Sequence, residues 1–238
     1  MKFMILIFIL IKIVSSNHVW KTDIFWCYER NDDVDVHVNH EYIHGHLRTA
    51  IYPYKFVFPF NISEINADSN LCNLRISVER KFHFNKITNK ACFKFKDGAL
   101  AHAGHTHYSK SYIHIHDDLL KVHPQIDEND YIYIDVFIHE FGHIIGLSHN
   151  SYDPTDVMYS FKRKESYLFE LYKNVVLFDK ILSRKNLLEL ISLYSNKFEK
   201  VNDEWAINKL NGQWIYFGTK ETKCVMYLPS LQNWIVLC

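Results

Sequence analysis

Apolar and aromatic positions fall into short stretches in the first half of the chain and into helical stripes around and beyond its middle. The short stretches predict strands at residues 22–28, 56–60, 74–78, 92–95, 100–103 and 112–116. Apolar residues three and four apart predict a helix over 35–52, and a run at 131–134 leads into a second helix. Strands followed by a central helix predict an α+β fold.

A last helix is predicted to open at residues 182–183, with Ser183 as its N-cap. Its buried side is expected to consist of Leu187, Leu190, Ile191 and Tyr194, at positions i, i+3, i+4 and i+7. Residues 160–180 are charged and aromatic and are interpreted as a surface excursion. Beyond residue 200, the turn at Asn211–Gly212 predicts a hairpin.

The N-terminus has the pattern of a secretory signal peptide. Lys2 precedes an apolar run at residues 3–11, and small residues near Ser16 suit cleavage. The run is too short to span a bilayer comfortably, and no other segment is suited to crossing one. We therefore expect a secreted protein with residues 1–16 removed, one domain at 17–199 and a short C-terminal extension at 200–238.

Charge and cysteine content narrow the possibilities further. The 238 residues carry 27 basic and 27 acidic side chains, a balance that argues against a nucleic-acid partner. The five cysteines are an odd set, so at least one stays free or pairs between chains. Cys224 and Cys238 flank a strand-like stretch and could close a local loop, while the remaining connectivity stays open.

Residues 139–149 carry the strongest chemical signal in the chain. His139 and His143 are four apart, so a helix places them on one face, and Gly146 allows the helix to end. The returning chain can bring His149 to the same point, which provides three imidazoles for a catalytic zinc. Glu140, beside the first ligand, is placed to act as general base.

The spacing of these residues, with Met158 downstream, is the metzincin pattern. The chain resembles the matrixins within that clan over about residues 20–195. The resemblance rests on Asp-Gly-Ala-Leu-Ala-His-Ala at 97–103, on His-Glu-Phe-Gly-His followed by Gly-Leu, and on Val-Met-Tyr at 157–159.

The resemblance implies a twisted, mixed five-stranded sheet with three helices and a Met-turn, in which Met158 packs beneath the metal. In a departure from the usual family member, the chain is expected to be a catalytic domain without propeptide or hemopexin domain, and therefore active on secretion. The resemblance also implies that an extended protein or peptide substrate pairs with an edge strand at Ala99, Leu100 and Ala101. The alternative is that this segment is an ordinary core strand.

Matrixins carry a second, structural zinc, for which the resemblance implies His83, His102 and His114 as ligands. The family's aspartate is replaced by Asn85, a poorer zinc ligand, so the site is expected to be weakened or rearranged. Other histidines compete for these places or are solvated loop residues: His105, His107 and His116. Calcium binding stays open, because Asp117 and Asp118 are equally consistent with ligands and with a solvated turn.

Three residues fall where the family shapes its S1′ pocket: Asp135, Tyr159 and Phe161. Asp135 either forms an acidic wall or complements the dipole at a helix N-terminus. Asn150 and Ser160 depart from the family's serine and proline, which leaves the shape of the pocket open.

The sequence thus predicts a secreted zinc-dependent metalloendopeptidase that hydrolyses extracellular or matrix proteins. The alternative is a secreted zinc-containing binding protein that lacks proteolysis. The eroded second-zinc and calcium positions favour the alternative, and the intact Glu140 favours the enzyme.

Overall fold

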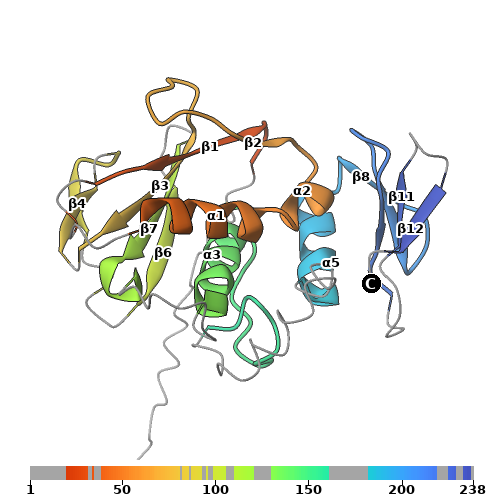
Figure 1. Ribbon diagram of the computed structural model, residues 1–238. Coiled ribbons are helices and arrows are strands. Elements are labelled where there is room, and N and C mark those ends of the chain that lie inside the picture. The colour runs from red at the N-terminus through yellow and green to blue at the C-terminus, as the bar shows by residue number, and fades with distance from the viewer. Residues whose placement is uncertain are drawn as a thin grey trace, which may run out of the picture.

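The computed structural model describes residues 20–31, 34, 39–80, 82–85, 87–92, 95, 99–105, 110–120, 130–160, 182–218, 225–228 and 233–236 (Figure 1). The predicted signal peptide, Phe161 and His107 lie outside these residues, as do Cys224, Cys238 and nearly all of the segment 160–180. No helix of the described residues combines the length and the apolar character needed to cross a membrane.

The helices are α1 (His40–Ile51), the single turn α2 (Tyr54–Val57), α3 (Asp130–Ile144), α5 (Arg184–Leu193) and a 3-10 turn at Asp117–Leu120. The strands in the first half are β1 (Ile24–Glu29), β2 (Ile62–Glu64), β3 (Leu74–Glu79), β4 (His83–Asn85), β5 (Lys90–Cys92), β6 (Ala101–His105) and β7 (Ser111–His116). Those in the C-terminal part are β8 (Phe198–Lys200), β9 (Trp205–Asn208), β10 (Trp214–Tyr216), β11 (Val225–Leu228) and β12 (Asn233–Val236).

Five strands form one mixed sheet in the order β2-β1-β3-β7-β6. β1 pairs in parallel with β2 and β3, and β3 pairs in parallel with β7. Only β6 runs antiparallel, and it forms one edge of the sheet. With α1, α3 and α5, this sheet confirms the predicted α+β architecture of five mixed strands and three helices.

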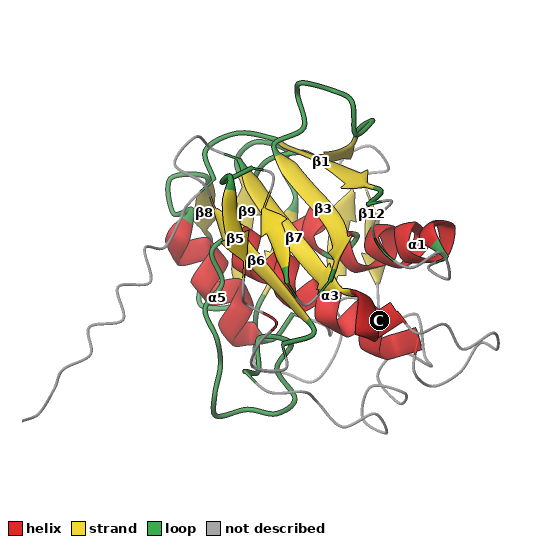
Figure 2. Cartoon of the chain, turned by 90° about the vertical axis from the view of Figure 1, so that its left-hand side faces the viewer, coloured by secondary structure: helices red, strands yellow, loops and turns green. Residues whose placement is uncertain are grey.

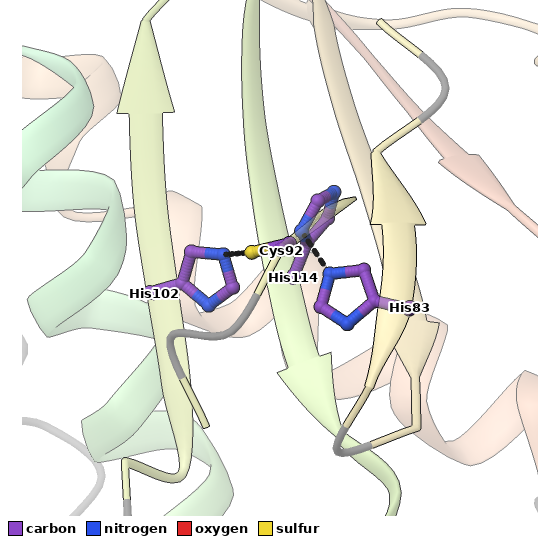
Figure 3. Close-up of side chains that lie close together, drawn as sticks. All are labelled: His83, Cys92, His102 and His114. Atoms are coloured by element: carbon purple, nitrogen blue, oxygen red, sulfur yellow. Dashed lines mark hydrogen bonds between the residues drawn. The ribbon is translucent and has the colours of Figure 1, made fainter. Parts of the chain in front are cut away.

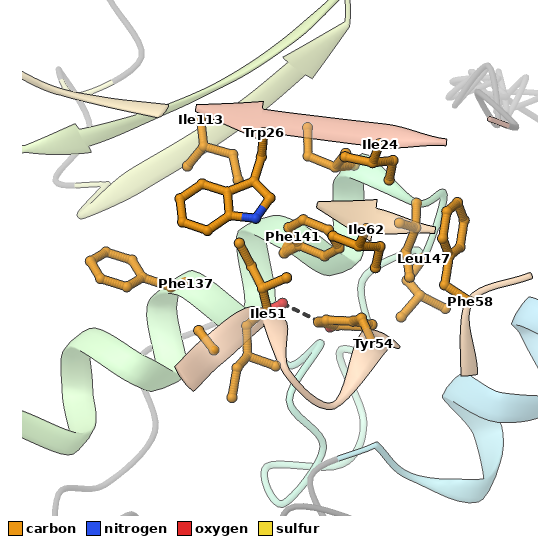
Figure 4. Packing of buried hydrophobic residues seen from close by; sticks show 14 of the residues in the cluster. Ile24, Trp26, Ile51, Tyr54, Phe58, Ile62, Ile113, Phe137, Phe141 and Leu147 are labelled. Carbon is orange, nitrogen blue, oxygen red and sulfur yellow. Dashed lines mark hydrogen bonds between the residues drawn. The ribbon is translucent and has the colours of Figure 1, made fainter. Parts of the chain in front are cut away.

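α1 and α3 cover one face of this sheet, as Figure 2 shows from the side. Asn39 starts α1, because its side chain accepts a hydrogen bond from the backbone N–H of Tyr42. From α3, Phe137 and Phe141 pack toward Trp26 and Ile113 of the sheet (Figure 4). Burial of these large apolar side chains is the main force that fixes α3 on the sheet.

The C-terminal part packs on the same core. Ser183 caps α5, as predicted, and the structure shows that it forms a capping box with Asn186. β8, β9 and β10 form an antiparallel sheet, and the predicted hairpin at Asn211–Gly212 is confirmed by the pairing of β9 with β10. From β8 onward, four buried side chains of the described residues belong to the central core: Phe198, Ala206, Ile215 and Phe217.

Some predicted element bounds were wrong. The expected strand at 56–60 is a helical turn followed by bends, and the strand that pairs with β1 lies at Ile62–Glu64. Tyr54 and Phe58 are both buried four residues apart, so the aromatic run fills the core from a turn instead of alternating across a sheet. Of the expected strand at 92–95, Cys92 is the last residue of β5 and Phe95 is not in a strand, while residues 93 and 94 lie outside the described part of the chain. The described part of the first helix begins only at His40.

A disulfide joins Cys27 of β1 to Cys72, just before β3. Both residues are buried, and the bond closes a loop with a sequence separation of 45. We expect the double variant Cys27→Ser/Cys72→Ser to lose about 2–4 kcal/mol of unfolding free energy, since the unfolded chain gains the freedom of that loop. Urea denaturation measures this. Wild type under reductant is the matched control, and equal midpoints with and without reductant would contradict the expectation.

Candidate metal centres

α3 carries two histidines of the predicted zinc motif, and the turn after it carries the third. His139 and His143 lie one turn apart on α3, which ends at Ile144. Gly146 adopts a φ of 98°, a left-handed conformation that favours glycine, and the N–H of Leu147 closes the helix on the carbonyl of Gly142. The chain then reverses and brings His149 beside the first two.

The three imidazoles converge through their Nε2 atoms. The Nε2–Nε2 distances are 3.1 Å for His139 and His143, 3.2 Å for His139 and His149, and 3.0 Å for His143 and His149. Three nitrogens bound to one tetrahedral zinc ion lie about 3.3 Å apart, given Zn–N bonds of about 2.0–2.1 Å. The donor set therefore fits a zinc ion held by three histidines.

Backbone carbonyls set the orientation of two of these rings. The Nδ1 atom of His139 lies 2.7 Å from the carbonyl of Val157, and that of His143 lies 2.9 Å from the carbonyl of Leu147. A carbonyl only accepts, so each Nδ1 carries the proton and each Nε2 keeps its lone pair for a metal. Burial lowers the pKa of His139 to about 4 and that of His143 to about 3, which favours the neutral, ligating form.

Glu140 follows the first ligand and points toward the edge strand. Its side chain is buried on α3 and accepts a hydrogen bond from the backbone N–H of Ala103 on β6. Burial raises the pKa of Glu140 to about 8, and the bond from Ala103 opposes part of that rise. A carboxyl group in this setting can exchange a proton near neutral pH.

Met158 lies fully buried beneath the histidine helix, as the Met-turn interpretation expects. A Cβ atom on Gly142 would stand 2.5 Å from the Met158 sulfur, so glycine lets the methionine side chain lie this close to the helix. The carbonyl of Met158 accepts from the N–H of Asn150 at 2.7 Å. The turn is therefore tied to the residue that follows His149.

Asp156 is the centre of a buried hydrogen-bond network that sequence reasoning missed. It is 1% exposed, and its carboxylate accepts from the Asn150 side chain at 2.9 Å and from the Ser183 hydroxyl at 2.9 Å. It also accepts from the N–H of Met158 at 2.8 Å. One carboxylate thus connects the residue after the third histidine, the Met-turn and the cap of α5. Asn150 stands where the family has serine, and its side-chain amide donates one of these hydrogen bonds.

The residues expected to shape the substrate cleft lie around this site. Asp135 is buried on α3, one turn before His139, and Tyr159 is half-buried and bridges to Asn150. The expected edge strand starts at Ala101, while Ala99 and Leu100 lie just before it. The carbonyl of Leu100 accepts from the N–H of His116. By strand alternation, the backbone groups of Ala101 and Ala103 point away from β7.

A second group of ligands lies on the opposite face of the sheet (Figure 3). His83, His102 and His114 come together as expected, and Cys92 joins them, with all four ligand atoms within 4.8 Å of one another. The amide oxygen of Asn85 does not replace the family's aspartate. It accepts from the N–H groups of Ile87 and Thr88, 2.9 Å away in each case, and so stabilises the β4–β5 turn.

The competing residues have other partners. His116 Nδ1 lies 3.2 Å from the carboxylate of Asp117, and His105 Nδ1 lies 2.7 Å from the hydroxyl of Ser111. Asp117 and Asp118 belong to the 3-10 turn, and the side chain of Asp118 lies outside the described residues. Within the described part of the chain, Asp117 belongs to neither group of potential metal ligands.

Comparison with known protein families supports the architecture seen here. The sequence model of the matrixin peptidases matches residues 19–175, which is more than half of the chain. A comparison with curated proteins returns no match.

Asp156 gives a test of how the site is held. Asp156→Asn replaces one acceptor oxygen by an amide donor that faces existing donors, so we expect a loss of about 1–3 kcal/mol in unfolding free energy. Because His149 loses its support, zinc affinity should fall about 10–100-fold. Competition with a zinc chelator measures the affinity. Asp153→Asn, in the same loop but bonded only within its own turn, is the control and should leave it unchanged.

Proposed function

Since the chain belongs to the matrixin family, a family of zinc metallopeptidases, we propose that it is a secreted zinc-dependent endopeptidase. The convergence of the Nε2 atoms of His139, His143 and His149, with Glu140 next to the first of them, carries the proposal. These three histidines would hold a zinc ion, which when bound would polarise the scissile carbonyl and lower the pKa of a water molecule.

In this proposal, Glu140 performs the proton transfers. Its carboxylate takes a proton from the attacking water, which adds to the carbonyl carbon of the peptide bond. Glu140 then delivers that proton to the leaving amide nitrogen as the carbon–nitrogen bond breaks. The bond from the Ala103 N–H holds the carboxyl between α3 and the edge strand, where a bound peptide would lie. His139, His143 and His149 keep their metal-binding geometry throughout.

We propose further that the substrate is an extended peptide segment paired with β6. β6 is the antiparallel edge of the sheet, and the backbone groups of Ala101 and Ala103 point outward. A peptide added as a further strand would pair with the backbone N–H and carbonyl of Ala101 and with the carbonyl of Ala103, and would place a peptide bond beside Glu140. Recognition of this kind depends mainly on the substrate's backbone, which suits an enzyme that cleaves extracellular or matrix proteins.

Secretion is supported by two features of the chain. The N-terminal residues have the basic, apolar and small-residue pattern of a signal peptide. The Cys27–Cys72 disulfide is typical of proteins that fold in an oxidising compartment.

The general-base role is tested with Glu140→Gln. This change keeps the three zinc ligands but removes the group that accepts the proton, so we expect kcat to fall about 10²–10⁴-fold while zinc stays bound. Cleavage of gelatin, casein and a quenched matrixin peptide measures the rate, and metal analysis measures the zinc content.

Glu199→Gln is the matched control, because the same chemical change is made at an exposed position on β8. It should leave the rate unchanged, and a chelator should abolish cleavage by wild type. Folded, zinc-loaded wild type that cleaves none of the three substrates would favour the binding-protein alternative.

The edge-strand role is tested with Ala101→Pro. Proline removes an outward N–H and is tolerated on an edge strand. We expect kcat/KM for peptides of several residues on each side of the cut to fall about tenfold, given the loss of roughly one substrate hydrogen bond. Zinc content and the thermal unfolding midpoint should stay close to wild type. An unchanged kcat/KM would argue that peptides do not pair with β6 at this residue.

A further inference from the structure

We propose that Cys92 is the fourth ligand of the second metal centre, where its thiolate takes the place of the family's aspartate beside His83, His102 and His114, and that this closed centre therefore selects a thiophilic divalent cation such as Zn²⁺. This centre lies on the face of the sheet opposite α1 and α3. The proposal goes beyond the endopeptidase function and does not depend on it.

Strand register brings the four ligands together as two cross-strand pairs. His83 of β4 is paired with Cys92 of β5, and His102 of β6 is paired with His114 of β7. Figure 3 shows the side chains of the two pairs turned toward one another. Residues paired across antiparallel strands place their side chains on the same face. The hairpin and the sheet therefore contribute two ligands each.

The ligand atoms already stand close to coordination spacing. Cys92 Sγ lies 3.1 Å from His102 Nε2, and His83 Nε2 lies 2.8 Å from His114 Nδ1. Atoms on the edges of a tetrahedral zinc site are about 3.3–3.6 Å apart, given Zn–N and Zn–S bonds of about 2.0–2.3 Å. The Nδ1 of His83 lies 2.9 Å from the carbonyl of Arg80, so this nitrogen carries the proton and Nε2 keeps its lone pair.

The surroundings of the cluster suit a metal better than a solvated group of side chains. His102 and His114 are 8% and 4% exposed, and Cys92 is 9% exposed. The ring of Phe95 packs against both His83 and His102, with ring centroids 5.3 Å and 4.9 Å away. An aromatic side chain packed against the ligands limits the access of solvent to a bound metal and lowers the local dielectric.

The chemistry of Cys92 decides which ions the centre takes. Among the described cysteines it is the one with a free thiol, because Cys27 and Cys72 are joined to each other. On binding, a metal–sulfur bond forms and the thiol proton leaves to solvent, with no change of oxidation state. Thiolate and imidazole ligands favour Zn²⁺ and Co²⁺ over Ca²⁺ and Mg²⁺. Four protein ligands leave no open position, so the centre is structural.

Cobalt substitution tests the proposal directly. Metal-free full-length protein is titrated with Co²⁺ and its absorption spectrum is followed. We expect two Co²⁺ per chain and a thiolate-to-cobalt charge-transfer band in the near ultraviolet, which the all-imidazole site cannot produce. Cys92→Ser should lose the band and weaken the second Zn²⁺ more than about 100-fold, because even groups that only support a ligand are worth 10–100-fold.

Further variants keep the test decisive if Cys92→Ser folds poorly. Cys92→Asp supplies a carboxylate and should bind the second metal without the band. Cys224→Ser and Cys238→Ser should keep the band. His149→Ala should lose one metal and keep the band, which separates this centre from the endopeptidase site. A band that persists in Cys92→Ser and Cys92→Asp would overturn the proposal, as would a wild type that binds Co²⁺ without a band.

Discussion

The antiparallel pairing of β6 with β7 places both His102 beside His114 and Ala103 beside Glu140, so it contributes to both candidate sites. Side chains alternate along β6, so His102 faces the hairpin β4–β5 while Ala103 packs toward α3. The small alanine allows α3 to lie close, and the Ala103 N–H can then reach Glu140. A shift of one residue in register would exchange the two faces and remove both arrangements together.

Around the histidine motif, the positions of the ligands are fixed by backbone carbonyls and by one carboxylate, none of which is itself a metal ligand. The carbonyls of Val157 and Leu147 fix two ring orientations, and Asp156 fixes the segments on either side of the Met-turn. Each of these acceptors lies in the loop after α3. This loop therefore orients the histidine side chains of the helix that precedes it. The motif residues supply the chemistry, and the loop supplies the geometry.

The sequence predicts those features that depend on local geometry. The spacing of His139 and His143 is the pitch of a helix, and Gly146 signals its end, so the cluster could be anticipated. The strand at 56–60 was wrong because an aromatic run has the same composition in a buried turn as in a strand. Cys92 was missed because its place depends on two strand registers. The one local hint in the sequence was that Cys92, ten residues before His102, had no role assigned to it.

The proposed metal ligands all lie earlier in the chain than the last residues that fill the core. The family match stops at residue 175, yet Phe198, Ala206, Ile215 and Phe217 fill the core that supports α3. The carbonyl of Phe217 also accepts from the side chain of Arg184, in the first turn of α5. A chain cut where the family resemblance ends would keep every ligand and lose part of the apolar interior that holds those ligands in place.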